Sequence, residues 1–185
     1  MPNFTKEAIK KTFLELLDKM PLNKITVKMI VEKCGINRNS FYYHYEDLPN
    51  LIEEIINEEA DRIMLEYPDI KSAETAMRAA CDFASKNRRA ILHIYNSVNR
   101  DIFEIYLWRV CDYVISSYGK NILDGKSISE PDREIIIRFY RCECFGIVIE
   151  WLNERMETDM QSYISRLFEL HHGMAEEMIR RSMDG

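Results

Sequence analysis

Apolar residues recur every three or four positions along most of this chain, which is the spacing of one face of an α-helix. The first such helix presents five residues on one face: Ile9, Phe13, Leu16, Leu17 and Met20. Thr5 has the side chain of an N-cap, and Pro21 cannot continue a helix, so these two residues set its expected limits. The chain is therefore predicted to open with an amphipathic helix.

Two short helical segments follow with little chain between them. Thr26 is the expected N-cap of the first segment, and Asn37 is the expected N-cap of the second. Gly35 stands between them, where a helix commonly ends in the left-handed conformation. The first segment turns four residues inward: Val27, Ile30, Val31 and Cys34. Two short helices joined by a tight turn within 25–45 predict a helix-turn-helix.

A longer helix is expected next. Asp47 is its N-cap, and Pro49 lies in the first turn, where the missing N–H of proline costs nothing. Apolar residues continue at helical spacing to about Glu66, and Pro68 closes the helix. This helix, 48–66, links the amino-terminal segment to the rest of the chain.

Helical periodicity continues to the end of the sequence. Five further helices are expected, in order from Ser72 onward, 88–98, 101–118, 129–151 and 159–181, with one long polar loop at 119–129. Six glycines and five prolines leave room for few tight turns, which disfavours an all-β fold. The fold class is therefore predicted as all-α, with about nine helices.

The helix predicted over 129–151 is apolar on nearly every side. A helix of this kind must be covered on two sides. One of the covering surfaces can belong to a second subunit of the same protein. The sequence thus favours a homodimer.

The second segment of the helix-turn-helix divides into an inner and an outer face. Phe41 and Tyr45 are four residues apart and can point with Ile36 into a three-helix core. Arg38 and Asn39 then face outward. In the major groove an arginine can form two hydrogen bonds to guanine, and an asparagine can do the same for adenine.

Polar and aromatic residues near this face are suited to phosphate contacts. Tyr42, Tyr43 and His44 offer hydroxyl or imidazole donors, and Thr26 and Lys28 lie at a helix amino terminus, which favours an anion. Four amphipathic helices with no DNA partner are the alternative, but they do not explain why the positions after the turn avoid Glu and Asp. The predicted DNA-binding residues are Thr26, Lys28, Asn37, Arg38, Asn39, Ser40, Tyr42, Tyr43 and His44.

The charge of the chain is distributed unevenly. The net charge is −6, but residues 1–45 hold eight Lys and Arg against four Asp and Glu, a balance of +4. The remaining residues therefore carry −10. Because phosphate contacts need only a local positive surface, the asymmetry is consistent with a DNA-facing amino-terminal module on an acidic body.

Other chemistries find little support. No signal peptide or apolar stretch of membrane-spanning length is present, and five cysteines without a signal peptide indicate the reducing cytoplasm. Cys142 and Cys144 are two residues apart and would project from a helix in different directions, so structural thiols are expected there and no metal site. A redox-sensing cysteine stays an alternative. No nucleophile–base motif or phosphate loop points to an enzyme, and no cofactor is predicted.

Residues 5–56 resemble the amino-terminal domain of TetR/AcrR-type bacterial transcriptional regulators. The resemblance rests on four motifs: Ile25-Thr26-Val27, Cys34-Gly35-Ile36, Phe41-Tyr42-Tyr43-His44-Tyr45 and Leu51-Ile52. The family's apolar–Tyr–x–His–aromatic signature is present in full. One position departs from the pattern, because Leu48 stands where the family usually has a phosphate-binding lysine, and Glu46 and Asp47 precede it.

The resemblance implies a domain organisation and partners. Residues 1–47 would form the DNA-binding domain, joined by the helix at 48–66 to an effector-binding and dimerisation domain at 68–185. The family dimerises through its last two helices and binds a roughly palindromic double-stranded operator. A small-molecule effector is implied as well, and four aromatic residues are candidates for its pocket: His93, Tyr106, Trp108 and Tyr140.

The predicted function is therefore a TetR-like transcriptional regulator, a ligand-responsive repressor that binds its operator as a homodimer. The alternative is a ligand sensor or coactivator of the same fold that binds no DNA and acts through protein contacts. Leu48 and the two acids before it are the best support for that alternative.

Overall fold

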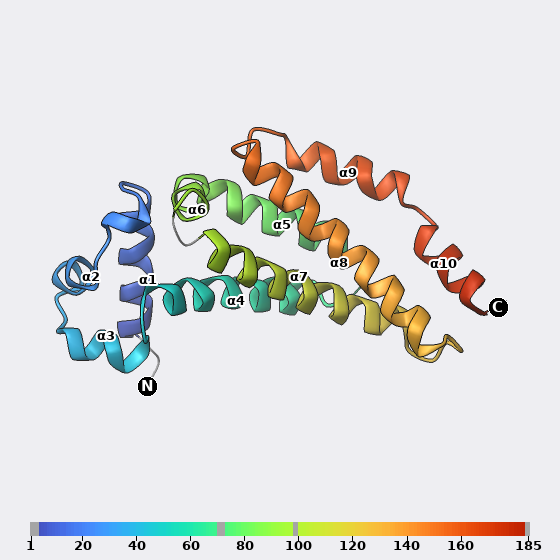
Figure 1. The fold of residues 1–185 in the computed structure, drawn as a ribbon, viewed down its shortest axis with the longest axis horizontal. Helices are drawn as coiled ribbons and strands as arrows, with labels where there is room; N and C mark the ends of the chain where they lie inside the picture. Colours follow the sequence, from blue (N-terminus) through green and yellow to red (C-terminus); the bar gives the residue numbers. More distant parts are fainter. Residues whose placement is uncertain (1–3, 70–72, 98–99, 184–185) are drawn as a thin grey trace. The chain divides into compact units, whose positions relative to one another are not determined.

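The computed structural model describes residues 4–69, 73–97 and 100–183, and the helices of these ranges are drawn in Figure 1. The amino-terminal elements are α1 (Phe4–Leu17), the short 3-10 helix η1 (Leu22–Lys24), α2 (Val27–Cys34), α3 (Arg38–His44) and α4 (Leu48–Glu66). The later elements are α5 (Ala73–Lys86), α6 (Arg88–Tyr95), α7 (Arg100–Leu123), α8 (Glu130–Asn153), α9 (Met160–Leu170) and α10 (Met174–Met183). Within the described ranges every regular element is helical, which confirms the all-α prediction.

The caps expected from the sequence are present. The Met29 N–H donates to Thr26 Oγ1 at 3.3 Å, and the Ser40 N–H donates to Asn37 Oδ1 at 2.8 Å. Gly35 is left-handed, with φ of 69°, so it ends α2 as predicted. The Asp47 side chain likewise caps α4 and the Ser129 side chain caps α8. Each of these groups bonds a backbone N–H that has no partner within its own helix.

Several predicted helix limits are wrong. Residue 5 lies inside α1, so Thr5 is not its cap, and the helix ends at Leu17 rather than at Pro21. The helix predicted to end at residue 118 continues to Leu123, which shortens the polar loop. The helix predicted over 88–98 ends at Tyr95, where Asn96 is its C-cap. The expected start at Ser72 lies outside the described residues.

The last predicted helix, over 159–181, is in fact two helices. α9 ends at Leu170, and α10 begins at Met174 after a turn in which Gly173 has φ of 79°. This conformation is open to glycine at little cost and breaks the helix. The apolar spacing continued on both sides of the turn, so periodicity alone did not show the break.

Contacts divide the chain into two compact units. The first comprises Met1–Glu59 with Ala84–Leu107, and the second comprises Ala60–Phe83 with Trp108–Gly185. In the first unit α1 packs against α2, α3 and α6. Its centre is formed by fully buried side chains of α1, α2, α3 and the start of α4: Ile9, Phe13, Leu17, Ile30, Phe41 and Leu51.

In the second unit α8 is not enclosed by its own chain. Ile136, Trp151 and Leu152 are buried, but Ile135 is 60% exposed and Phe139 is 44% exposed. Burial on all sides, as expected for so apolar a helix, is therefore not achieved within one chain. Among the described residues, no helix combines the length and the apolar character needed to span a membrane.

Candidate nucleic-acid interface

Helix α3 has one buried face and one exposed face. Phe41 and Tyr45 are buried, as predicted, and their ring centroids are 5.6 Å apart. Ile36, expected beside them, is only half-buried. Arg38, Asn39 and Tyr43 are exposed on the other face. The seven-residue helix thus packs against α1 and α2, with Phe41 and its C-cap Tyr45 buried in the core. Its polar side chains face solvent.

At the start of α3, two of the residues predicted to contact DNA, Asn37 and Ser40, are hydrogen-bonded to each other. Asn37 Oδ1 accepts hydrogen bonds from both the N–H and the hydroxyl of Ser40, at 2.8 and 3.1 Å. Asn37 and Ser40 therefore stabilise the turn of the helix-turn-helix. Arg38 and Asn39 lie between them with exposed side chains and form no hydrogen bond within the described residues.

The aromatic residues at the end of α3 extend from the surface. Tyr43 is 85% exposed, and its ring lies edge-on to that of His44 with centroids 5.0 Å apart. Tyr42 is also exposed, and His44 is half-buried. Large aromatic side chains that stay exposed to water are suited to contact a partner.

The start of α2 offers two further polar side chains on the surface. Thr26 is exposed and caps the helix. The Lys28 ammonium lies 3.7 Å from the Glu32 carboxylate, and both side chains are 63% exposed. An exposed pair of this kind contributes little and dissociates easily, so Lys28 stays available for a phosphate.

An open hollow of about 340 Å³ separates the starts of α2 and α4. Val27 and Tyr42 are among its lining residues, and Glu46, Asp47 and Leu48 line it where the chain enters α4. The hollow therefore combines one residue predicted to contact phosphate, Tyr42, with two carboxylates. Leu48 contributes no charge to offset them.

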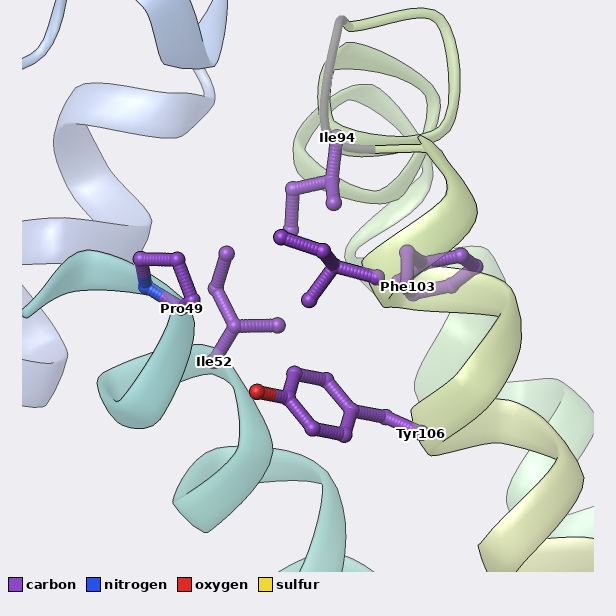
Figure 2. A pocket seen from close by; sticks show the side chains of 6 residues that line it. Pro49, Ile52, Ile94, Phe103 and Tyr106 are labelled. Atoms are coloured by element: carbon purple, nitrogen blue, oxygen red, sulfur yellow. The ribbon is translucent and has the colours of Figure 1, made fainter.

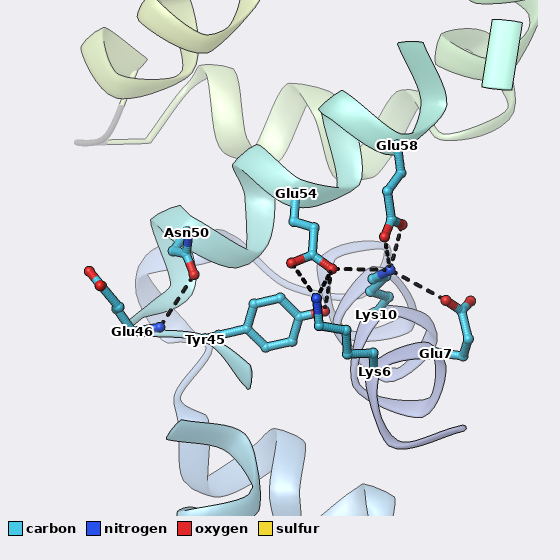
Figure 3. A network of polar contacts seen from close by, with 8 residues as sticks. All are labelled: Lys6, Glu7, Lys10, Tyr45, Glu46, Asn50, Glu54 and Glu58. Atoms are coloured by element: carbon cyan, nitrogen blue, oxygen red, sulfur yellow. Dashed lines mark hydrogen bonds and ion pairs between the residues drawn. The ribbon is translucent and has the colours of Figure 1, made fainter. Parts of the chain in front are cut away.

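The structure corrects the charge argument made from residues 1–45. Lys6 donates to both carboxylate oxygens of Glu54, at 2.7 and 2.8 Å, and Lys10 is paired with Glu58 (Figure 3). Tyr45 also donates to Glu54, at 3.3 Å. These ion pairs join α1 to α4 across 48 residues of sequence. Two of the counted cations are thus neutralised by acids of α4, which lie outside the range counted.

The ionisation of this network follows from its burial and its pairing. Burial opposes the charged form of Lys10, but hydrogen bonds and attraction from Glu58 and Glu7 outweigh it and raise the pKa of the ammonium. Burial also opposes ionisation of Glu54. The contacts with Lys6 and Lys10 outweigh this effect, so the pKa of the Glu54 carboxyl is lowered. Both partners therefore stay charged near neutral pH.

With α4 included, the positive balance disappears. Residues 1–59 contain eight Lys and Arg against ten Asp and Glu, a balance of −2. Lys33 is also paired, at 2.6 Å from Glu15. Within the described part of this segment, four basic side chains form no ion pair within 4.0 Å: Lys11, Lys19, Lys24 and Arg38.

The four candidate pocket residues divide between the two units. In the first unit the ring of His93 lies with Nδ1 2.6 Å from the Leu17 carbonyl oxygen, at the end of α1. Tyr106 lines a small apolar space with Ile52, Ile94 and Phe103 (Figure 2). This space does not admit a molecule the size of water. His93 therefore contacts backbone, and Tyr106 packs among apolar side chains.

In the second unit the other two candidates have different neighbours. Trp108 meets Phe145 edge-on, with centroids 5.2 Å apart, and the Arg141 guanidinium lies 4.7 Å above its ring. Tyr140 packs beside Leu123, Ile136 and Ile179. Their assignment to an effector pocket stays a prediction.

The neighbours of Cys142 and Cys144 differ as the helical spacing predicted. Cys142 is exposed, whereas Cys144 Sγ lies 3.8 Å from Cys111 Sγ of α7. Sequence spacing gave no signal for this pair, because the two residues are 33 positions apart. Within the described residues, no three His, Cys, Asp or Glu side chains are grouped to hold a metal ion.

A helix-turn-helix with a polar outer face, followed by a larger helical region, defines a class: transcriptional regulators that bind DNA. Residues 71–173, more than half of the chain, match the family described as "Transcriptional regulator C-terminal region". The chain belongs to the TetR family of transcriptional regulators, a family without enzymatic activity.

Similar proteins support this assignment. The HTH-type transcriptional regulator YxbF of Bacillus subtilis (strain 168) is 22% identical over 180 residues, which cover 92% of this chain and 45% of that protein. The chain thus spans about half the length of the curated relative that it matches.

Solved structures share the fold at low sequence identity. The dihydroxyacetone kinase operon activator DhaS matches with a TM-score of 0.75 and 15% identity, over 94% of this chain and 97% of that one. A TetR regulator from Rhodococcus sp. RHA1 matches with a TM-score of 0.57 and 14% identity, over 90% and 96% of the two chains. NalD, the secondary repressor of the MexAB-OprM multidrug efflux pump in Pseudomonas aeruginosa, matches with a TM-score of 0.54 and 16% identity, over 95% of each chain.

Proposed function

We propose that this regulator binds a roughly palindromic operator as a homodimer and acts as a repressor that a small ligand releases. The observation that carries the proposal is the division of α3 into a buried aromatic face and an exposed polar face. Such a helix can enter the major groove with its amino-terminal side chains while its anchors stay in the core.

Contacts to DNA divide by residue. Arg38 and Asn39 are the base readers, because both are exposed at the start of α3 and free of hydrogen bonds within the described residues. Tyr42, Tyr43, Thr26 and Lys28 fix the register by contacts to phosphate, with His44 as a weaker candidate because it is half-buried. Asn37 and Ser40 stabilise the turn by their mutual hydrogen bonds and so position Arg38 and Asn39, which lie between them.

The proposed dimer uses the apolar surface of the second unit that one chain leaves open. Ile135 and Phe139 of α8 are exposed, and Tyr163 and Leu170 are exposed on α9. A two-fold axis through this surface would cover α8 and bring equivalent faces together. In such a dimer the two copies of α3, the recognition helices, would meet successive major grooves about 34–36 Å apart.

The division of labour along the chain is part of the proposal. Residues 1–47 bind DNA, 48–66 form the connecting helix, and 68–185 bind the effector and the second subunit. Such a regulator works where the bacterial chromosome lies, in the cytoplasm.

For the effector, the group around Trp108 has the most suitable chemistry. Arg141 is paired with Asp112 and lies over the Trp108 ring, but its buried Nε has no hydrogen-bond acceptor among the described residues. A buried donor without an acceptor is unfavourable unless a ligand supplies one. The expected effector therefore carries an acceptor, such as a carboxylate or carbonyl oxygen, and a flat apolar part.

The test is selection of bound sequences from random duplex DNA, followed by titration of the selected site at several salt concentrations. We expect a palindromic site and a log Kd that rises with log salt, because each phosphate contact releases counterions. Transcription from a promoter that contains the site then gives the sign of regulation. A drop on protein addition supports a repressor, and a rise makes the protein an activator.

One observation favours a second function. The balance of −2 over residues 1–59, together with Glu46, Asp47 and Leu48 at the start of α4, is unusual for a DNA-facing surface. A sensor or coactivator that acts through protein contacts would have this composition. If the purified protein binds neither the selected pool nor random duplex even at low salt, the DNA-binding proposal is wrong and this one replaces it.

A further inference from the structure

Two thiols from different helices of the second unit are in contact. Cys111 of α7 and Cys144 of α8 have their Sγ atoms 3.8 Å apart, and one thiol is hydrogen-bonded to the other. At this separation no other atom fits between the two sulfurs. All five cysteines are free thiols in this structure.

The remaining cysteines lie in different surroundings. Cys81 is buried, and burial is the main cause that raises the pKa of the Cys81 thiol to about 12. Cys144 is close enough to add a smaller electrostatic contribution. Cys142 is exposed and precedes Cys144 by two residues on the same helix. Cys111 and Cys144 are therefore distinguished by their direct sulfur–sulfur contact.

We propose that Cys111 and Cys144 form an intrachain disulfide when the protein meets a hydroperoxide, and that this bond joins α7 covalently to α8. The inference concerns this chain's own thiols and is independent of whether the protein binds DNA.

The two thiols have complementary roles in the reaction. The hydrogen bond between the two thiols lowers the pKa of Cys144, and the same contact together with burial raises the pKa of Cys111. Cys144 is also the less buried of the two. The thiolate of Cys144, the stronger nucleophile at neutral pH, therefore reacts first.

The chemistry balances without a further reactant. Cys144 sulfur attacks one oxygen of the hydroperoxide, the O–O bond breaks, and a sulfenic acid and one water or alcohol form. Cys111 sulfur then attacks the sulfenic sulfur and displaces its hydroxyl group as a second water. The two thiols lose two electrons and two protons in total, and the peroxide is reduced by two electrons.

The bond requires a small movement. A disulfide has a sulfur–sulfur distance of about 2.05 Å, so rotation about χ1 of one or both cysteines must close the gap. Helical cysteines have two common χ1 rotamers, and a side chain as short as cysteine changes between them without moving the helix.

Peptide mapping of the oxidised full chain tests the proposal directly. Trypsin releases residues 110–120, which contain Cys111, and residues 142–155, which contain both Cys142 and Cys144. Cleavage after Glu143 by a glutamate-specific protease separates Cys142 from Cys144. The protein is treated with hydrogen peroxide, its remaining thiols are alkylated, and both proteases are applied without reductant.

We expect a linked species that joins residues 110–120 to residues 144–150, two hydrogens lighter than the sum of its peptides, and its loss after dithiothreitol. Cys81→Ser should leave the yield of this species unchanged, whereas Cys144→Ser should abolish it. Because the species is detected in the unsubstituted chain, misfolding of a variant does not affect the result. A Cys111 thiol that stays fully alkylatable while Cys144 becomes sulfinic acid would overturn the proposal, as would linkage to Cys142 alone.

Discussion

The Lys6 ammonium donates to both carboxylate oxygens of Glu54, and this contact joins the first helix of the chain to α4 (Figure 3). Lys10 lies 3.4 Å from the same carboxylate, and Tyr45, which anchors α3, donates to it as well. Glu54 is thus the point at which α1, the recognition helix and the connecting helix meet. Its consequences for stability and pH response can be measured.

Replacement of Glu54 by alanine should lower the free energy of unfolding by about 1–3 kcal/mol, because two ammonium groups and a buried phenol lose an acceptor. Urea denaturation measures the change. Glu134→Ala is the matched control, since the Glu134–Arg138 pair is exposed and its loss should cost less than about 0.5 kcal/mol. Equal losses in the two variants would mean that Glu54 contributes no more than a surface ion pair.

The same residue predicts part of the acid response. The pKa of Glu54 is lowered from its usual 4.5 in the folded protein, because the lysine contacts outweigh the cost of burial. The folded state therefore gains stability above the usual pKa and loses it as the pH falls through the folded value. The difference in unfolding free energy between the unsubstituted protein and Glu54→Gln should shrink between about pH 5 and pH 3. A difference that stays constant over this range would contradict the lowered pKa.

Two neighbouring aromatic residues should separate folding from DNA binding. Phe41 is fully buried, so Phe41→Ala should cost about 3–5 kcal/mol of stability. Tyr43 is 85% exposed, so Tyr43→Ala should change stability by less than about 0.5 kcal/mol. If Tyr43 contacts phosphate, its variant binds every duplex more weakly and by a similar factor, which binding titrations on specific and random DNA would show.

Arg38→Ala should weaken binding to the selected operator by about 1–3 kcal/mol and relax the preference at one base pair. Lys11→Ala removes the same charge from an exposed, unpaired position of α1 and should leave the base preference intact. Selection of bound sequences with each variant gives the comparison. An equal loss of affinity on every sequence would make Arg38 a phosphate contact.

Leu48→Lys should restore the phosphate contact that is common in the family. We expect tighter binding at low salt, with a plot of log affinity against log salt that is steeper by about 0.9. Leu65→Lys adds the same charge on the same helix, about 25 Å further along its axis, and should change neither quantity. A similar gain in both variants would indicate a general effect of net charge.

Local features of this structure could be predicted from the sequence, and long-range ones could not. The caps at Thr26, Asn37 and Asp47 were predictable because each side chain bonds a backbone N–H three residues away. The burial of Phe41 and Tyr45 followed from helical spacing. The pairing of Lys6 with Glu54 had no such signal, because the two residues meet only through the packing of α1 on α4.

The same reason explains two other differences. The Cys111–Cys144 contact depends on how α7 packs against α8, which residue spacing does not specify. The break between α9 and α10 was marked only by Gly173, since the apolar pattern on either side was continuous. A glycine within an otherwise helical pattern is a weak signal unless its φ is known.

The scarcity of unpaired cations near α3 affects how this protein would be distributed in a cell. Non-specific attraction to the chromosome comes almost entirely from phosphate contacts, so few free cations give weak binding to bulk DNA. Most molecules would then diffuse freely, and occupancy of the operator would depend on a small number of base contacts. A substitution that removes one of these base contacts would then lower operator occupancy directly, because little phosphate attraction remains to offset the loss.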